Sequence, residues 1–106
     1  MDKLVIIKTT VKKKVIKNNI INELIKNNYV ACVNVIENVS SHFMWKGKVE
    51  KEKEYILFAK TMKRKEKLVY ETIRINHDYE IPEIITLSVN NAENSYLIWA
   101  NRNVVS

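Results

Sequence analysis

Cysteine, proline and glycine are almost absent from this sequence, which has one residue of each among 106. The single cysteine, Cys32, excludes an intrachain disulfide and favours a reducing compartment. The single glycine excludes the glycine-rich loops that cradle phosphate groups. No repeat, linker or low-complexity segment interrupts the chain, so its length predicts one domain over residues 1–106.

Arginine and long apolar runs are also scarce. Only three of the 18 basic residues are arginine, and lysines alternate with glutamates, so the net charge of +6 indicates a solvated surface rather than a nucleic-acid reader. A basic run covers residues 12–14. The apolar run at residues 4–7 is too short for a signal-peptide core or a membrane span. We therefore expect a cytoplasmic protein with no nucleic-acid or membrane partner.

Apolar periodicity along the chain predicts alternating strands and helices. Period-two and continuous apolar runs indicate strands, whereas apolar residues spaced by three and four indicate helices. The only glycine follows a lysine between two strand-like runs, which predicts a tight hairpin turn. The expected order is strand 4–10, helix 13–28, strand 30–36 with a bend at 37–38 and a continuation over 41–45, turn 46–47, strand to 61, helix 64–76, strand 83–89 and a short helix 92–102.

This order, β-α-β-β-α-β with a helical tail, is typical of an α+β, ferredoxin-like split β-α-β fold. In that fold an antiparallel sheet carries both main helices on one face. Each of the two hairpin arms is about 50 Å long at 3.3 Å per residue, whereas a compact domain of this size is only about 33 Å wide. The tip, with Phe43, Met44 and Trp45, should therefore project and pair with another subunit.

The segment 76–83, "NHDYEIPE", holds the residues with the clearest chemical potential. His77, Glu80 and Glu83 lie three apart, and imidazole and carboxylate groups are zinc or copper ligands. Pro82 disfavours helix before it, so the segment is predicted to be extended or turned. The alternative is structural, because a histidine at a helix C-terminus is stabilised by the helix dipole and a glutamate at a strand start is often only solvated.

Catalysis is not expected from this sequence. Cys32 lies in an apolar strand and is interpreted as a core thiol. Neither histidine can be placed beside it as a base, and no set of nucleophile, base and oxyanion donors is recognisable. The aromatic residues match no nucleic-acid stacking motif and are interpreted as core or interface residues.

Three segments together resemble a known family over nearly the whole chain. They are "VACVNVIENVSSHFMWKGKVEKEKEYILFAKT" at 30–61, "NHDYEIPEIITLSV" at 76–89 and "NSYLIWANRN" at 94–103. In this order and spacing they look like the CutA divalent-cation-tolerance family. The resemblance implies a ferredoxin-like subunit in a homotrimer similar to the PII signalling proteins. It also implies a non-enzymatic role in copper-type tolerance, with weak copper or zinc binding at an intersubunit cleft.

The resemblance further implies which residues bind the metal. The family's histidine and glutamate correspond to His77 and Glu83, and Asp78 or Glu80 is expected to assist. The family's first-strand cysteine falls at Lys8 here, which argues against a site selective for soft Cu(I). Asp78 also replaces a proline of the family pattern and adds a carboxylate beside the histidine.

Two other functions remain open from the sequence. The first is a PII-like sensor of a small anionic ligand, with Lys60, Tyr79 and Trp45 around an intersubunit cleft. This alternative rests on shared architecture alone. The second is a trimeric scaffold that binds a protein partner and no small molecule.

Overall fold

A computed structural model describes residues 2–106 of the chain and confirms the predicted order of elements. None of the helices in this described part is long and apolar enough to cross a membrane. The elements are β1 (Leu4–Val11), α1 (Lys14–Lys26), β2 (Cys32–Trp45), β3 (Lys48–Met62), a 3-10 turn (Lys63–Lys65), α2 (Glu66–Asn76), β4 (Ile84–Ser88) and α3 (Asn94–Asn103).

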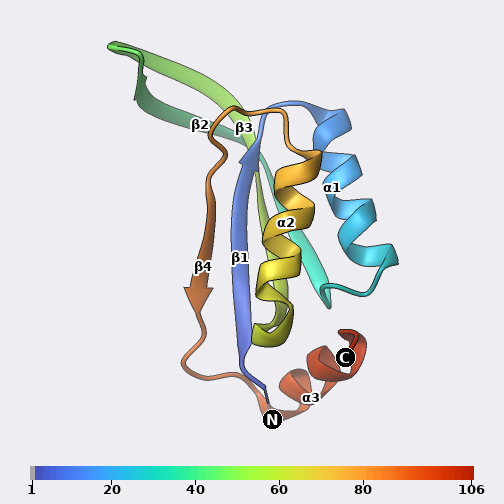
Figure 1. The fold of residues 1–106 in the computed structure, drawn as a ribbon. Helices are drawn as coiled ribbons and strands as arrows, with labels where there is room; N and C mark the ends of the chain where they lie inside the picture. The colour runs from blue at the N-terminus through green and yellow to red at the C-terminus, as the bar shows by residue number, and fades with distance from the viewer. Residues whose placement is uncertain (1) are drawn as a thin grey trace.

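The strands form one antiparallel sheet in the order β2-β3-β1-β4, and the predicted α+β, ferredoxin-like fold is confirmed. β1 is central, as its apolar character on both faces predicted. α1 and α2 lie side by side on one face of the sheet (Figure 1). Between these helices and the sheet lies the main core, formed by Ile7, Val11, Ile20, Leu24, Val30, Leu57, Ala59, Val69 and Ile73.

The short helix α3 covers one end of the opposite face of the sheet. Its Ala100, followed by Val104, packs against Leu4 of β1 and Met62 of β3 in a second buried cluster. Because side chains alternate along a strand, Leu4 points away from the face that Ile7 presents to α1 and α2. The rest of this second face, toward the hairpin, has no helix over it (Figure 1).

The β2–β3 hairpin confirms both backbone features that the sequence predicted. At the tip, Lys46 and Gly47 have φ angles of 49° and 81°, as a two-residue type I′ turn requires. A bulge interrupts the pairing between Ile36 and Val39, and Asn38 within it has a φ of 59°. Asparagine tolerates this left-handed conformation better than most residues, so the bend predicted at 37–38 is formed without glycine.

The hairpin also projects beyond the rest of the subunit, as its length predicted (Figure 1). The longest dimension is 45 Å and the radius of gyration is 14.4 Å, whereas a compact domain of this length has a radius of gyration of about 13 Å. Near the tip, Phe43, Met44 and Val49 remain 42%, 64% and 76% exposed. A single subunit therefore leaves apolar side chains in solvent on a protruding arm.

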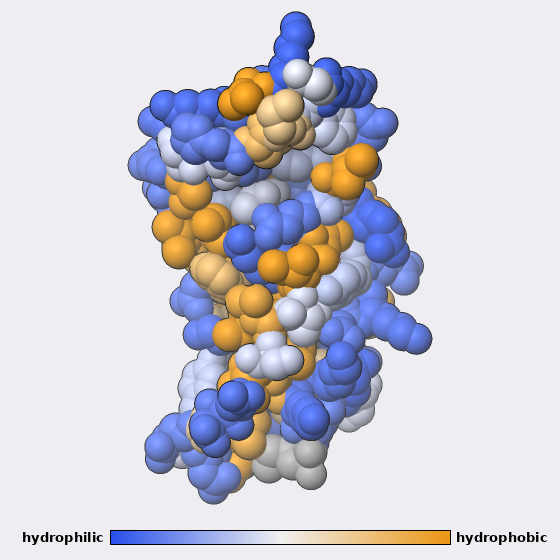
Figure 2. Space-filling model, turned by 90° about the vertical axis from the view of Figure 1, so that its left-hand side faces the viewer, coloured by the Kyte–Doolittle hydropathy of each residue, from blue (hydrophilic) through white to orange (hydrophobic). Residues whose placement is uncertain are grey.

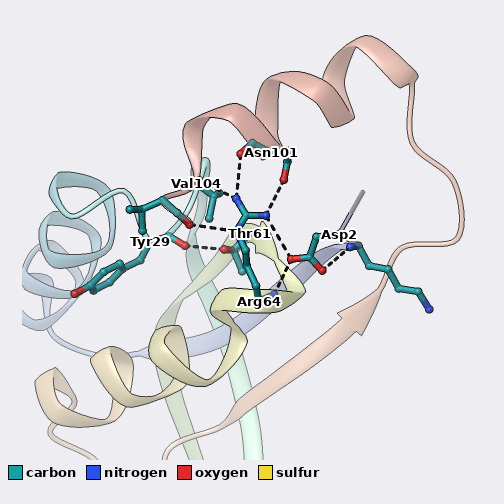
Figure 3. A network of polar contacts seen from close by, with 8 residues as sticks. Asp2, Tyr29, Thr61, Arg64, Asn101 and Val104 are labelled. Atoms are coloured by element: carbon teal, nitrogen blue, oxygen red, sulfur yellow. Dashed lines mark hydrogen bonds and ion pairs between the residues drawn. The ribbon is translucent and has the colours of Figure 1, made fainter.

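Arg64 joins both ends of the chain to the sheet (Figure 3). Its guanidinium donates hydrogen bonds to the carbonyl oxygens of Asn101 and Val104, at 3.2 Å and 2.8 Å, and to Asn101 Oδ1 at 2.7 Å. It also lies 3.4 Å from the Asp2 carboxylate. These bonds satisfy carbonyl groups that the end of α3 leaves without helical partners.

Asp2 completes this network from the N-terminal side. Burial opposes ionisation of its carboxyl, but hydrogen bonds from the Arg64 and Lys3 backbone N–H groups, together with the Arg64 guanidinium, outweigh that cost and lower the pKa of Asp2. The carboxylate is therefore ionised at neutral pH and contributes to stability there.

Candidate functional site

A cleft lies under the projecting hairpin, between the inner face of its strands and the loop that precedes β4. We call it the hairpin cleft. It encloses about 590 Å³ and combines carboxylates with aromatic side chains. Its lining is formed by Thr10, Lys12, Ser41, His42, Phe43, Trp45, Glu50, Glu52, Glu54, Tyr79, Glu80, Ile81 and Glu83.

Alternate residues of β3 line the cleft with carboxylates. Glu50, Glu52 and Glu54 are two apart, so a strand places all three on the same face. In the segment "KVEKEKE" lysines alternate with glutamates, which predicted a solvated surface and not this strip of charge. The period-two spacing of the glutamates was the available signal, but only the folded hairpin brings them opposite the loop that carries Glu80 and Glu83.

Glu54 is the most deeply buried of these carboxylates, at 7% exposure. Its Oε2 accepts a hydrogen bond of 2.5 Å from the Tyr79 hydroxyl. Burial, and then the bonded carboxylate of Glu54, raise the pKa of Tyr79 far above its ordinary value of 10.0. Tyr79 is therefore a protonated donor at physiological pH, and it gives Glu54 a hydrogen bond but no positive charge.

The His77 side chain lies behind the cleft, and both of its ring nitrogens are hydrogen-bonded within the subunit. Its side chain is fully buried, at 0% exposure. Nδ1 accepts a hydrogen bond from the Tyr79 N–H at 3.2 Å, so Nε2 carries the proton and donates it to the Thr10 carbonyl at 2.9 Å. Nε2 thus holds the loop against β1, Nδ1 is bonded within the loop, and neither nitrogen has a free lone pair in this conformation.

Glu83 forms an ion pair with Lys8 of β1, with 3.0 Å between Oε2 and Nζ. The residues are 75 positions apart and meet because β4 pairs with β1. Lys8 is the position that the family resemblance assigned to a cysteine. Here it supplies a cation that neutralises one of the two residues predicted to bind metal.

The basic run at residues 12–14 is also largely neutralised by neighbouring acids. Lys12 Nζ lies 3.1 Å from Glu52, and Lys13 Nζ lies 3.3 Å from Asp78. Asp78 therefore points toward the start of α1 and is not part of the cleft lining. These pairs agree with the interpretation of the lysines as surface residues and argue against an anion-binding patch at this run.

Of the predicted site residues, the structure brings some together and separates others. Lys60 lies elsewhere, with its Nζ 5.6 Å from the centre of the Tyr96 ring on α3. Cys32 pairs opposite Lys60 in the sheet and is likewise outside the cleft. The predicted residues that do line the hairpin cleft are Trp45, Tyr79, Glu80 and Glu83.

Within residues 2–106, no three or more His, Cys, Asp or Glu side chains converge as a metal ion requires. His77 is hydrogen-bonded at both nitrogens and Glu83 is paired with Lys8. The donors of one subunit therefore do not fit a divalent metal by direct coordination in this conformation.

Comparison with known proteins identifies the family of this fold. The model of the CutA1 divalent ion tolerance protein family matches residues 5–103. The chain belongs to the CutA1 family. A divalent-cation tolerance protein CutA of Thermotoga maritima is 37% identical over 83 residues, which cover 78% of this chain and 81% of that protein.

Other CutA1 relatives are longer than this chain. The chloroplastic protein CutA of Arabidopsis thaliana is 28% identical over 95 residues, and the match spans 90% of this chain but 52% of that protein. Among solved structures, a divalent ion tolerance protein CutA1 from Ehrlichia chaffeensis superposes with a TM-score of 0.93 at 25% identity. This superposition covers 100% of this chain and 99% of the other. The subunit fold is thus shared along its full described length.

Proposed function

We propose that this CutA1 chain is a non-enzymatic homotrimer that contributes to divalent-cation tolerance by attracting cations weakly into the hairpin cleft. The observation that carries the proposal is the charge of the cleft. Five glutamates and one lysine line it, on a chain whose net charge is +6. A negative cleft on a basic protein concentrates cations locally. We place the protein in the cytoplasm because its single cysteine suits a reducing compartment.

The uncovered face of the sheet supports the trimer. Ile36, Ile85 and Leu87 are 48%, 41% and 38% exposed on it. Figure 2 shows the side of the molecule that carries β4, on which apolar atoms form an interrupted band. The exposed area of 6804 Å² exceeds the roughly 6,200 Å² typical of a monomer of this mass. Sedimentation should give three times 12.5 kDa, and a monomeric mass would refute the trimer.

Cation binding is expected to be weak because the predicted ligands are already engaged. A metal that used Glu83 would compete with the Lys8 ammonium, and one that used His77 would break two hydrogen bonds. Of the two carboxylates predicted to assist, Asp78 is paired with Lys13, whereas Glu80 has no ion-pair partner within residues 2–106 and is the more available. Without a cysteine at position 8, zinc and Cu(II) suit these groups better than Cu(I).

Replacing Lys8 tests this proposal directly. Lys8→Met removes the cation and frees the Glu83 carboxylate, so zinc affinity measured by calorimetric titration should rise about fivefold, which corresponds to about 1 kcal/mol of relieved competition. Lys60→Met is the matched control, because Lys60 lies on the same face of the sheet but outside the cleft. Equal zinc affinity in the two variants would refute a role for Glu83.

The alternatives that the sequence left open have less support. A small anionic ligand in this cleft would meet five glutamates, and Lys60, the cation expected to bind it, lies toward α3. A trimeric scaffold could bind its partner through the exposed hairpin tip, but this function does not explain the negative charge of the cleft. A thermal-shift screen of carboxylic acids and nucleotides tests the first, and affinity capture with the trimer tests the second.

A further inference from the structure

We propose that the hairpin cleft binds a linear aliphatic polyamine. Such a ligand has ammonium groups separated by alkyl segments, and the cleft offers carboxylates separated along a strand and flanked by aromatic rings. This proposal does not depend on metal coordination by His77 and Glu83, and it concerns a different set of contacts in the cleft.

Charge without a counterion is the first observation that points to this ligand. Glu54 is 7% exposed and receives a hydrogen bond only from the neutral Tyr79 hydroxyl. Within residues 2–106, neither Glu54 nor Glu50 has a cationic partner. A buried carboxylate without a counterion is costly, and a cationic ligand in the cleft would offset that cost.

The spacing of the carboxylates is the second observation. Residues two apart on a strand are about 6.6 Å apart, so Glu50, Glu52 and Glu54 form a ladder of charge along the cleft. Two amines joined by an extended four-carbon chain are about 6 Å apart, as five bonds of about 1.5 Å in zigzag give. A ladder of this kind suits a ligand with several separated charges. A bare metal ion instead requires its donors at a common point, and the residues of 2–106 provide no such point.

Aromatic walls are the third observation. Phe43, Trp45 and Tyr79 line the cleft together with the glutamates. Aromatic faces attract ammonium groups and also cover alkyl chains. The chain itself provides an example, since Lys46 Nζ lies 5.7 Å from the centre of the Trp45 ring. The cleft of about 590 Å³ is far larger than a single metal ion needs and is in the size range of organic-ligand sites.

Calorimetric titration with spermidine at constant ionic strength tests the proposal. Wild-type protein should bind spermidine, and Glu50→Gln should weaken the affinity at least fivefold, because Glu50 is only half-buried and its replacement leaves the fold intact. Trp45→Leu should also weaken spermidine binding. Glu71→Gln is the matched control, since it removes an exposed carboxylate on α2 outside the cleft and should leave the affinity unchanged.

Three results would overturn the proposal. They are no binding of spermidine to the wild-type trimer, equal affinities in Glu50→Gln and Glu71→Gln, and displacement of spermidine by Mg²⁺ in proportion to its charge alone. Competition by Mg²⁺ of that kind would mean that the cleft attracts cations by charge alone and does not recognise the polyamine. The zinc titration of Lys8→Met is read separately, so failure of metal binding and failure of polyamine binding are distinguishable.

Discussion

The two ends of the subunit differ in whether their charged side chains have partners. At the α3 end, Arg64 is surrounded by acceptors, and its guanidinium bonds to Asn101 and Val104 while pairing with Asp2 (Figure 3). At the hairpin end, Glu50 and Glu54 carry charge with no cationic partner in residues 2–106. The Arg64 network stabilises the fold. The unpaired carboxylates lower the stability, and such groups are expected where a ligand binds.

The largest effect is expected from removing the centre of the stabilising end. Arg64→Ala leaves the carbonyl groups at the end of α3 without their donor and removes the guanidinium that pairs with the Asp2 carboxylate. We expect a loss of about 2–4 kcal/mol in the free energy of unfolding, since bonds to charged groups contribute about 1.5–3 kcal/mol each and water replaces part of them. Urea denaturation at matched protein concentration measures this loss. Arg102→Ala, which removes an exposed arginine on α3, is the control and should change little.

A smaller, pH-dependent effect is expected from Asp2→Asn. The lowered pKa of Asp2 means that its stabilising contribution is present above the ordinary pKa of 3.8 and is lost as the pH falls through the folded-state value. Wild-type protein should therefore be more stable than Asp2→Asn at neutral pH, and the difference should shrink as the pH falls below 3.8. A difference that stays constant down to that acidity would show that the ionised carboxylate is not responsible.

Local patterns in the sequence predicted the fold well because each depends on near neighbours. The Lys46-Gly47 turn, the bend at Asn38 and the central position of β1 each follow from a few adjacent residues. The role of Arg64 was not predicted, because its acceptors at the end of α3 are 37 to 41 residues away and three of them are backbone carbonyls with no signature in the sequence.

The site was less predictable for the same physical reason. Part of the segment 76–83 lines the hairpin cleft of the subunit, but the hydrogen bond that engages His77 with the Thr10 carbonyl depends on a contact across 67 residues. The pairing of Lys8 with Glu83 depends on strand register, which no short motif encodes. The glutamate ladder has a local signal in its period of two, yet its function is recognisable only when the hairpin faces the loop.

The most direct test of the contrast between the two ends is the stability of Glu54→Gln without added ligand. Glutamine keeps an acceptor for the Tyr79 hydroxyl but removes the uncompensated charge. The variant should be as stable as wild type or more stable by up to about 1 kcal/mol, whereas Tyr79→Phe, which leaves the charge and removes its donor, should be less stable. A loss of more than about 1 kcal/mol in Glu54→Gln, measured by urea denaturation, would contradict the account, because it would show that the charge of Glu54 serves the fold rather than a ligand.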